Sequence, residues 1–163
     1  MTPMGAPTRR AAGRRPSARA AGVAHATRDN LGYLLAKASQ RWNEQLQRGF
    51  AEAGYPEVKA SYGSVLIPLL EEDGLRMGEI ARRARLSKQT MTTMVRLCER
   101  DGLVERGPDP DDRRATRVHL TAKARRFQPT AEHVLAELER DATSSLGERR
   151  LGELRRSLRQ LSG

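Results

Sequence analysis

The chain has 163 residues, and its 30 lysines and arginines outnumber its 20 aspartates and glutamates, which gives a formal net charge of +10. This length corresponds to one domain. The longest apolar stretch runs only from Val65 to Leu70, whereas a membrane-spanning helix needs about 20 residues, so a transmembrane protein is excluded. The single cysteine excludes an internal disulfide, and we expect a cytoplasmic protein with an ordinary hydrophobic core and no membrane partner.

Residues 1–28 differ in composition from the rest of the chain. They contain six arginines but no acidic and no aromatic residue. Such a segment cannot bury enough apolar surface to offset an ordering cost of about 1 to 2 kcal/mol per residue, so we expect a disordered basic tail. Two roles stay open for it: a permissive extension, or an arm that adds phosphate contacts to DNA.

The next segments have the apolar spacing of helices. From Leu31 to Phe50 this spacing predicts a long helix, with Asp29 as its N-cap and Gly54 as its stop. A second helix is expected over residues 61–72, bent at its internal proline.

Two short helices follow, over residues 77–84 and 87–100, and a tight turn joins them. Ser87 is the predicted N-cap of the second helix. The order helix, turn, helix is that of a helix-turn-helix motif.

The apolar period then changes from 3.6 to 2. Residues 103–106 and 116–120 are predicted strands of a β-hairpin around a turn-rich segment. Thr121 is expected to cap a further helix, kinked near Pro129, and Gly147 to separate it from a last helix. The predicted fold class is therefore mainly α with a small β-hairpin wing, a winged helix-turn-helix.

Residues 87–100 have two different faces. Met91, Met94, Val95 and Cys98 share one stripe and are the expected buried face. The polar residues elsewhere on the helix and at its start have donors and acceptors suited to base edges and phosphates. These candidate DNA-binding residues are Ser87, Lys88, Gln89, Thr90, Thr92, Thr93 and Arg96. The alternative is a solvated charged face.

A basic cluster precedes this helix. Arg82, Arg83, Arg85 and Lys88 place four positive charges in seven residues without an acid, and such a cluster is expected to lie beside a DNA backbone.

Three segments resemble the MarR family of bacterial transcriptional regulators: Met77 to Met91, Leu103 to Arg106, and Pro108 to Arg114 leading to Leu120-Thr121. The resemblance extends over residues 29–163. Its most specific part is the wing, where the family's D-x-R pattern falls on Asp112-Arg113-Arg114. The chain departs from the family at Arg85, where such turns often have glycine, and a left-handed residue there costs about 1 kcal/mol.

The resemblance implies a homodimer that reads a pseudo-palindromic operator in double-stranded DNA. Residues 29–58 and 121–163 would supply the dimerisation helices, and residues 59–120 the DNA-binding lobe. Arg113 and Arg114 would contact DNA, with Arg114 in the minor groove and Asp112 orienting its guanidinium. The expected dimerisation residues are Leu31, Leu34, Leu35, Leu151, Leu154 and Leu158.

The family resemblance also implies a small-molecule pocket between the dimerisation helices and the winged lobe. Five of the six aromatic residues lie between residues 33 and 62. Trp42 and Tyr62 are the candidate pocket residues for a small aromatic or phenolic effector, with a role in the core as the alternative.

The sequence thus predicts a ligand-responsive DNA-binding regulator, a repressor rather than an activator, and not an enzyme. We expect no cofactor and no metal site. The only residues at the spacing of metal ligands are His133 and Glu137, one helical turn apart, and we interpret them as a pair on the surface. Two alternatives stay open: a redox sensor acting through Cys98, and a nucleoid-type protein that binds DNA without sequence preference.

Overall fold

The computed structural model describes residues 28–112 and 114–163. These residues divide into two compact units, of which the first ends at Lys37 and the second spans Ala38–Gly163. In the first unit, helix α1 (Leu31–Glu52) begins after Asn30, whose side-chain oxygen accepts a hydrogen bond from the backbone N–H of Tyr33 at 2.9 Å. The prediction of Asp29 as the N-cap was wrong by one residue, because it is Asn30 whose side chain accepts from the first turn of the helix.

In the second unit, α1 ends as predicted before Gly54, which has a φ of 91°. The predicted second helix starts with a 3₁₀ turn, η1 (Ala60–Tyr62), and continues as α2 (Gly63–Glu71). Helices α3 (Met77–Arg83) and α4 (Lys88–Arg100) form the helix-turn-helix. In the turn between them Arg85 has a φ of 53°, so the chain does place an arginine in the left-handed region.

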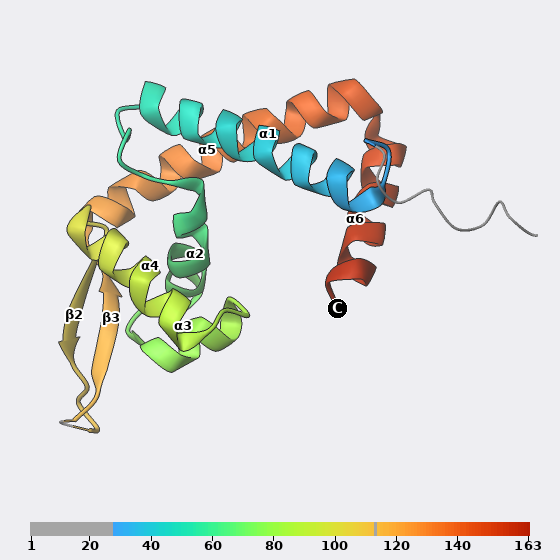
Figure 1. Ribbon diagram of the computed structural model, residues 1–163. Coiled ribbons are helices and arrows are strands. Elements are labelled where there is room, and N and C mark those ends of the chain that lie inside the picture. The colour runs from blue at the N-terminus through green and yellow to red at the C-terminus, as the bar shows by residue number, and fades with distance from the viewer. Residues whose placement is uncertain (1–27, 113) are drawn as a thin grey trace, which may run out of the picture. The chain divides into compact units, whose positions relative to one another are not determined.

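The wing belongs to a sheet of three antiparallel strands in the order β1-β3-β2. β2 (Val104–Pro108) and β3 (Thr116–Leu120) form the predicted hairpin, which projects beyond α3 and α4 in Figure 1. β1 (Leu75–Arg76) pairs with β3 through Leu75 and Val118. It was not predicted, because two residues are too short for an alternating pattern.

Two helices complete the second unit. α5 (Ala122–Leu146) is capped by Thr121, whose hydroxyl oxygen accepts from the N–H of Ala124 at 3.2 Å, and it contains Pro129 without ending there. α6 (Glu148–Ser162) follows Gly147, which has a φ of 77°. None of the described helices is long and apolar enough to cross a membrane.

The core of the second unit lies where α2, α3, α4, the sheet and the first half of α5 meet. Its fully buried side chains include Val65, Leu69, Ile80, Met91, Val95, Leu103 and Val118. Phe50 of α1 and Phe127 of α5 pack edge to face with 5.0 Å between ring centroids. Helix α4 enters this core through Met91, Val95 and Cys98, so its opposite face remains exposed.

Candidate nucleic-acid interface

The exposed face of α4 carries most of the predicted DNA-binding residues. Met91, Val95 and Cys98 are fully buried on its opposite face. Ser87 caps the helix, since its hydroxyl oxygen accepts from the backbone N–H of Thr90 at 3.1 Å. The side chains left exposed are those of Ser87, Lys88, Gln89, Thr90, Thr93 and Arg96.

Thr92 differs from the rest of this predicted set. It is half-buried, and its hydroxyl donates to the backbone oxygen of Lys88 at 2.8 Å. Thr93 makes a similar bond to the oxygen of Gln89 at 3.2 Å but lies on the exposed face. The outward face of α4 is therefore narrower than the sequence suggested.

The basic cluster before α4 is partly neutralised within the lobe. Arg83 pairs with Glu72 and, at 2.9 Å, with Glu79. Arg82 also pairs with Glu79 at 2.5 Å. Arg85 donates to the backbone oxygen of Ser162 at 2.5 Å. The positive potential that Arg82 and Arg83 offer to DNA is thus smaller than their number implies, whereas the hydrogen bond of Arg85 to a neutral oxygen leaves its charge in place.

The start of the wing loop, directly after β2, contains a buried carboxylate that the sequence did not reveal. Asp109 is 2% exposed, and its carboxylate lies 2.6 Å from Nε of Arg76 and 3.0 Å from Nε of Arg117. Its other oxygen accepts from the backbone N–H of Asp111 at 2.9 Å. The hydrogen bond from Arg76 is the largest of the effects that hold the pKa of Asp109 far below its usual value, against the opposing effect of burial. Asp109 therefore ties the hairpin to β1.

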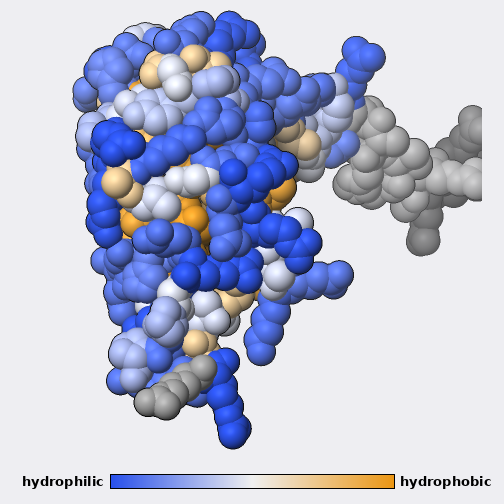
Figure 2. Space-filling model, turned by 90° about the vertical axis from the view of Figure 1, so that its left-hand side faces the viewer, coloured by the Kyte–Doolittle hydropathy of each residue, from blue (hydrophilic) through white to orange (hydrophobic). Residues whose placement is uncertain are grey.

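The wing tip does not have the contact that the D-x-R resemblance implied. Oδ1 of Asp112 accepts a hydrogen bond from the backbone N–H of Arg114 at 3.0 Å, and between the side chains of these two described residues there is no ion pair. Asp112 thus shapes the turn, and its role in orienting the guanidinium of Arg114 on DNA stays a prediction. The side chains of Asp112 and Arg114 are both exposed. The face of the molecule drawn in Figure 2 is mostly polar, with small apolar patches. Arg113 lies outside the described residues.

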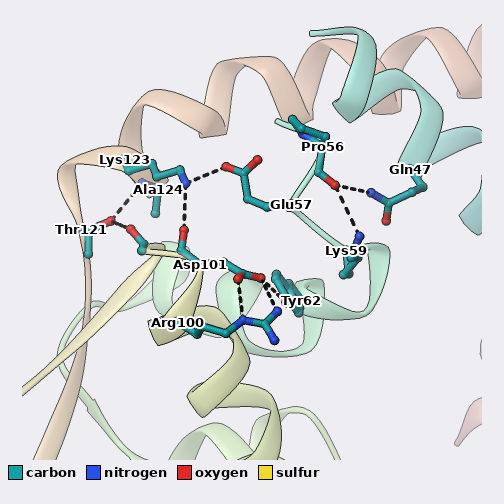
Figure 3. Close-up of polar contacts among 11 residues, drawn as sticks. Gln47, Pro56, Glu57, Lys59, Tyr62, Arg100, Asp101, Thr121, Lys123 and Ala124 are labelled. Atoms are coloured by element: carbon teal, nitrogen blue, oxygen red, sulfur yellow. Dashed lines mark hydrogen bonds and ion pairs between the residues drawn. The ribbon is translucent and has the colours of Figure 1, made fainter. Parts of the chain in front are cut away.

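The end of α4 is held by a polar network around Asp101 (Figure 3). The carboxylate of Asp101 accepts from the hydroxyl of Tyr62 at 2.5 Å and from Nε of Arg100 at 2.8 Å. These two hydrogen bonds lower the pKa of Asp101 to about 2, and the bond from Arg100 has the larger effect. Burial, followed by the contact with Asp101, raises the pKa of Tyr62 to about 12. The Tyr62 hydroxyl therefore stays protonated and bonded.

A cavity of about 180 Å³ lies between α1, α2 and the first half of α5. Its wall is mostly apolar, with Lys59, Gln128 and Glu132 as polar members. The apolar residues include Leu46, Phe50, Val58, Leu66, Ala124, Phe127 and Ala131. Neither predicted pocket residue lines it: Tyr62 is buried with its hydroxyl on Asp101, and Trp42 lies along a separate groove beside Leu138. The spacing of aromatic residues in the sequence could not distinguish residues of the core from residues that line the cavity.

Two further predicted features concern Cys98 and the His133-Glu137 pair. Cys98 is fully buried, and burial raises the pKa of its thiol to about 12. A redox sensor needs an exposed thiolate, so this environment disfavours sensing through Cys98. His133 and Glu137 lie 3.5 Å apart on the exposed surface of α5, and no group of three potential metal ligands occurs within the described part of the chain.

Most of the predicted dimerisation leucines are exposed. Leu31, Leu34 and Leu35 are 57%, 49% and 39% exposed, and Leu154 and Leu158 are 44% and 39% exposed. Leu151 is the exception. It is buried within the chain, 9% exposed, so its part in an interface is smaller than the leucine spacing suggested.

A two-helix motif joined by a tight turn, with a polar exposed second helix and a following hairpin, defines a winged helix-turn-helix. Residues 58–115 match the model of the MarR family, in agreement with the predicted resemblance. Proteins of this family are transcriptional regulators that bind DNA.

Solved structures agree with this assignment. A probable transcriptional regulator from Pseudomonas aeruginosa is 25% identical, with a TM-score of 0.72 over 82% of this chain and 97% of its own. The transcriptional repressor CouR, bound to a 23-mer DNA duplex, is 27% identical with a TM-score of 0.72 over 82% of this chain and 93% of its own. The regulator PcaV from Streptomyces coelicolor shares the fold at 20% identity, with a TM-score of 0.69 over 82% of this chain and 92% of its own. The curated proteins include no significant match.

Proposed function

We propose that this protein is a ligand-responsive transcriptional repressor that binds a pseudo-palindromic operator as a homodimer and catalyses no reaction. The observation that carries the proposal is the exposed face of α4, on which Gln89, Thr93 and Arg96 stand above a fully buried opposite face. These side chains offer amide, hydroxyl and guanidinium groups, which can bond to base edges in a major groove.

DNA is the proposed macromolecular partner. The CouR repressor, 27% identical to this chain, has been solved on a DNA duplex. With two α4 helices related by a two-fold axis, the half-sites would lie about 34 to 36 Å apart, one helical turn of DNA. Residues 59–120 form the DNA-binding lobe in this proposal, and the wing extends its contacts toward the adjacent minor groove.

The proposed dimer uses residues 29–58 and 121–163. Leu154 and Leu158 are exposed on α6, and Leu31, Leu34 and Leu35 are exposed on α1. Exposed leucines at helical spacing are unfavourable in water and typical of a helix face that a partner covers. A second copy is the partner that a palindromic operator requires.

The proposed effector is a small aromatic or phenolic molecule in the cavity. A dry apolar cavity of about 150 Å³ in another protein holds benzene, and the cavity here has about 180 Å³. Lys59 and Gln128 are among its lining residues and would bond to a hydroxyl or carboxylate on the ring.

The experiment that tests this function is selection of duplexes from a random library by the purified protein, followed by footprinting. We expect one palindromic site with two protected half-sites, and sedimentation of the complex as a dimer on one duplex. Binding without any preferred sequence would instead favour the nucleoid-type alternative, to which the arginines of residues 1–28 would contribute.

A further inference from the structure

The turn between α3 and α4 requires a residue in the left-handed conformation. The N–H of Arg85 donates to the backbone oxygen of Arg82 at 3.1 Å, and the N–H of Leu86 donates to that of Ala81 at 2.9 Å. These two bonds form a Schellman motif, whose left-handed residue is usually glycine because glycine has no Cβ. Arg85, with a φ of 53°, is the only non-glycine residue with a positive φ in the described part of the chain.

The side chain of Arg85 contacts a part of the chain far away in sequence. Its Nη1 donates to the backbone oxygen of Ser162 at 2.5 Å, and its Nη2 donates to that of Gly163 at 2.6 Å. Both oxygens lie at the end of α6, where the last carbonyl groups of a helix have no partner within the helix and a positive charge is favourable. Arg85 therefore makes a contact between the helix-turn-helix and α6 that glycine could not make.

The covalent connections of the DNA-binding lobe, residues 59–120, lie at the other end of α4. The chain enters the lobe after Glu57 and leaves it before Lys123, and Nζ of Lys123 lies 2.6 Å from Oε1 of Glu57. Nζ of Lys123 also donates to the backbone oxygen of Asp101, the C-cap of α4, at 2.8 Å. Figure 3 shows both contacts. The two connections thus lie side by side at the end of α4.

The contact of Arg85 with α6 lies beyond the start of α4. This helix has 13 residues, so its two ends are about 20 Å apart at 1.5 Å per residue. Two neighbouring connections permit the lobe to rotate about them, whereas a third contact about 20 Å away opposes this rotation. Helix α6 can provide a fixed point because Arg155 joins it to α5 through an ion pair with Glu139.

We propose that Arg85 is a positioning residue that holds the start of α4 in a fixed place relative to α6, and so determines the half-site spacing that the dimer accepts. At about 20 Å from the covalent connections, a rotation of about 10° moves the start of α4 by about 3.5 Å, close to the rise of one base pair. Lys88 and Gln89 are exposed at this end of α4. The inference rests on the proposed function, for which it names a specificity-determining residue.

A phosphate contact is the other role that a basic residue in this turn could have. Such a contact would strengthen binding to every duplex alike, because phosphates carry no information about sequence or spacing. A positioning residue instead changes the relative affinity for duplexes whose half-sites lie at different distances. The half-site spacing therefore distinguishes the two roles of Arg85.

The main variant is Arg85→Gly, which removes the guanidinium and suits the left-handed backbone. Thermal unfolding should show it to be at least as stable as wild type. Arg85→Asn is the second variant in case the first does not fold, since asparagine also tolerates this conformation and is too short to reach α6. Arg82→Ala is the matched control. It removes one charge from the same basic cluster, but Arg82 pairs with Glu79 and not with α6.

A reciprocal variant changes the other side of the contact. Leu161→Pro disrupts the last turn of α6 and so displaces the oxygens of Ser162 and Gly163. Leu161 is 64% exposed, so the core of the unit is retained. Sedimentation should show that this variant and Arg85→Gly are both dimers, as the comparison of half-site spacing requires.

The first measurement is amide hydrogen exchange of residues 158–163 in the full chain without DNA. Arg85→Gly should raise exchange there several-fold, because the last turn of α6 loses its contact with the lobe. Arg82→Ala should leave this exchange as it is in wild type. Unchanged exchange in Arg85→Gly would overturn the proposal, since α6 would then not be held by Arg85.

The second measurement is the affinity for the selected duplex and for two duplexes with one base pair added or removed between the half-sites. Wild type should lose about tenfold or more on each altered duplex, and Arg85→Gly less than about threefold. Arg82→Ala should keep the wild-type preference for one spacing. In the Leu161→Pro background, Arg85→Gly should change the spacing preference no further, because both changes remove the same contact.

A spacing preference of Arg85→Gly equal to that of wild type would overturn the proposal. If its affinity then fell equally on all three duplexes, Arg85 would be a phosphate contact only. If the wild-type protein selects no duplex, the proposed function fails, whereas the exchange experiment still decides whether Arg85 holds α6.

Discussion

Arg76 and Asp109 form an ion pair of 2.6 Å between β1 and the wing, although they are 33 residues apart in the chain. Asp109 is buried, and the half-exposed Arg76 immediately precedes α3. The pair therefore connects the start of the wing loop to the residue that precedes the first helix of the helix-turn-helix. It gives the hairpin a fixed direction relative to α4, which a two-stranded ribbon alone does not have.

The first prediction concerns this pair. Asp109→Asn should weaken binding to the selected duplex by about tenfold, because removing one charge of a buried ion pair leaves Arg76 and Arg117 unpaired and frees the hairpin. The control is Asp111→Asn, since Asp111 also contacts Arg117, at 3.1 Å, but has a side chain that is 76% exposed. Fluorescence anisotropy at fixed salt measures both. Equal losses in the two variants would mean that only net charge matters.

The second prediction separates two roles for Asp112. Because its carboxylate bonds to the backbone N–H of Arg114, Asp112→Asn should preserve the turn and bind DNA as well as or more tightly than wild type. Asp112→Ala should bind less tightly. Weaker binding by the asparagine variant as well would show that the negative charge is needed, as a contact with the guanidinium of Arg114 would require.

The same set of measurements includes Arg114→Ala. This variant should lower the salt slope of binding by about one counterion.

A third prediction tests readout by α4. Gln89→Ala and Thr93→Ala should each lose about 1 to 3 kcal/mol on the selected duplex and little on random DNA. Thr143→Ala is the matched control, since the hydroxyl of Thr143 donates to the oxygen of Glu139 at 2.8 Å, as that of Thr93 does to Gln89. Similar losses on both kinds of duplex would contradict the assignment of α4 as the recognition helix.

The fourth prediction distinguishes two leucines of α6. Leu158→Glu should convert a dimer into a folded monomer, because Leu158 is exposed. Leu151→Ala should instead lower the free energy of unfolding by about 2 to 5 kcal/mol, since Leu151 is buried within the chain. Sedimentation and thermal unfolding measure the two effects. A Leu158→Glu protein that remains dimeric would remove α6 from the proposed interface.

The fifth prediction follows from the pKa of Asp101, which is lowered from 3.8 to about 2. A depressed pKa in the folded state contributes stability above the unfolded value, and this contribution is lost as the pH falls from about 4 to about 2. Asp101→Asn should therefore flatten the decrease in unfolding free energy over that range. Denaturant titrations at several pH values provide the comparison.

The local features of this fold follow from short stretches of sequence. The cap at Ser87, the stop at Gly54 and the buried stripe of Met91, Val95 and Cys98 each depend on residues within one or two turns. Spacing and side-chain type therefore predicted the helix-turn-helix and the hairpin. The same reasoning identified most of the exposed residues of α4.

Other features required the tertiary structure, because they join residues that no local pattern connects. Asp109 meets Arg76 across the sheet, and Tyr62 meets Asp101 across 39 residues. Sequence spacing could show that Tyr62 and Leu151 lie on apolar faces, but not whether a cavity, a partner or the chain itself covers those faces. Packing decides this, since a side chain becomes buried only when separate elements meet around it. The sequence by itself thus determined the elements and the face of α4, whereas the assembled core decided the cavity wall and the polar network beside it.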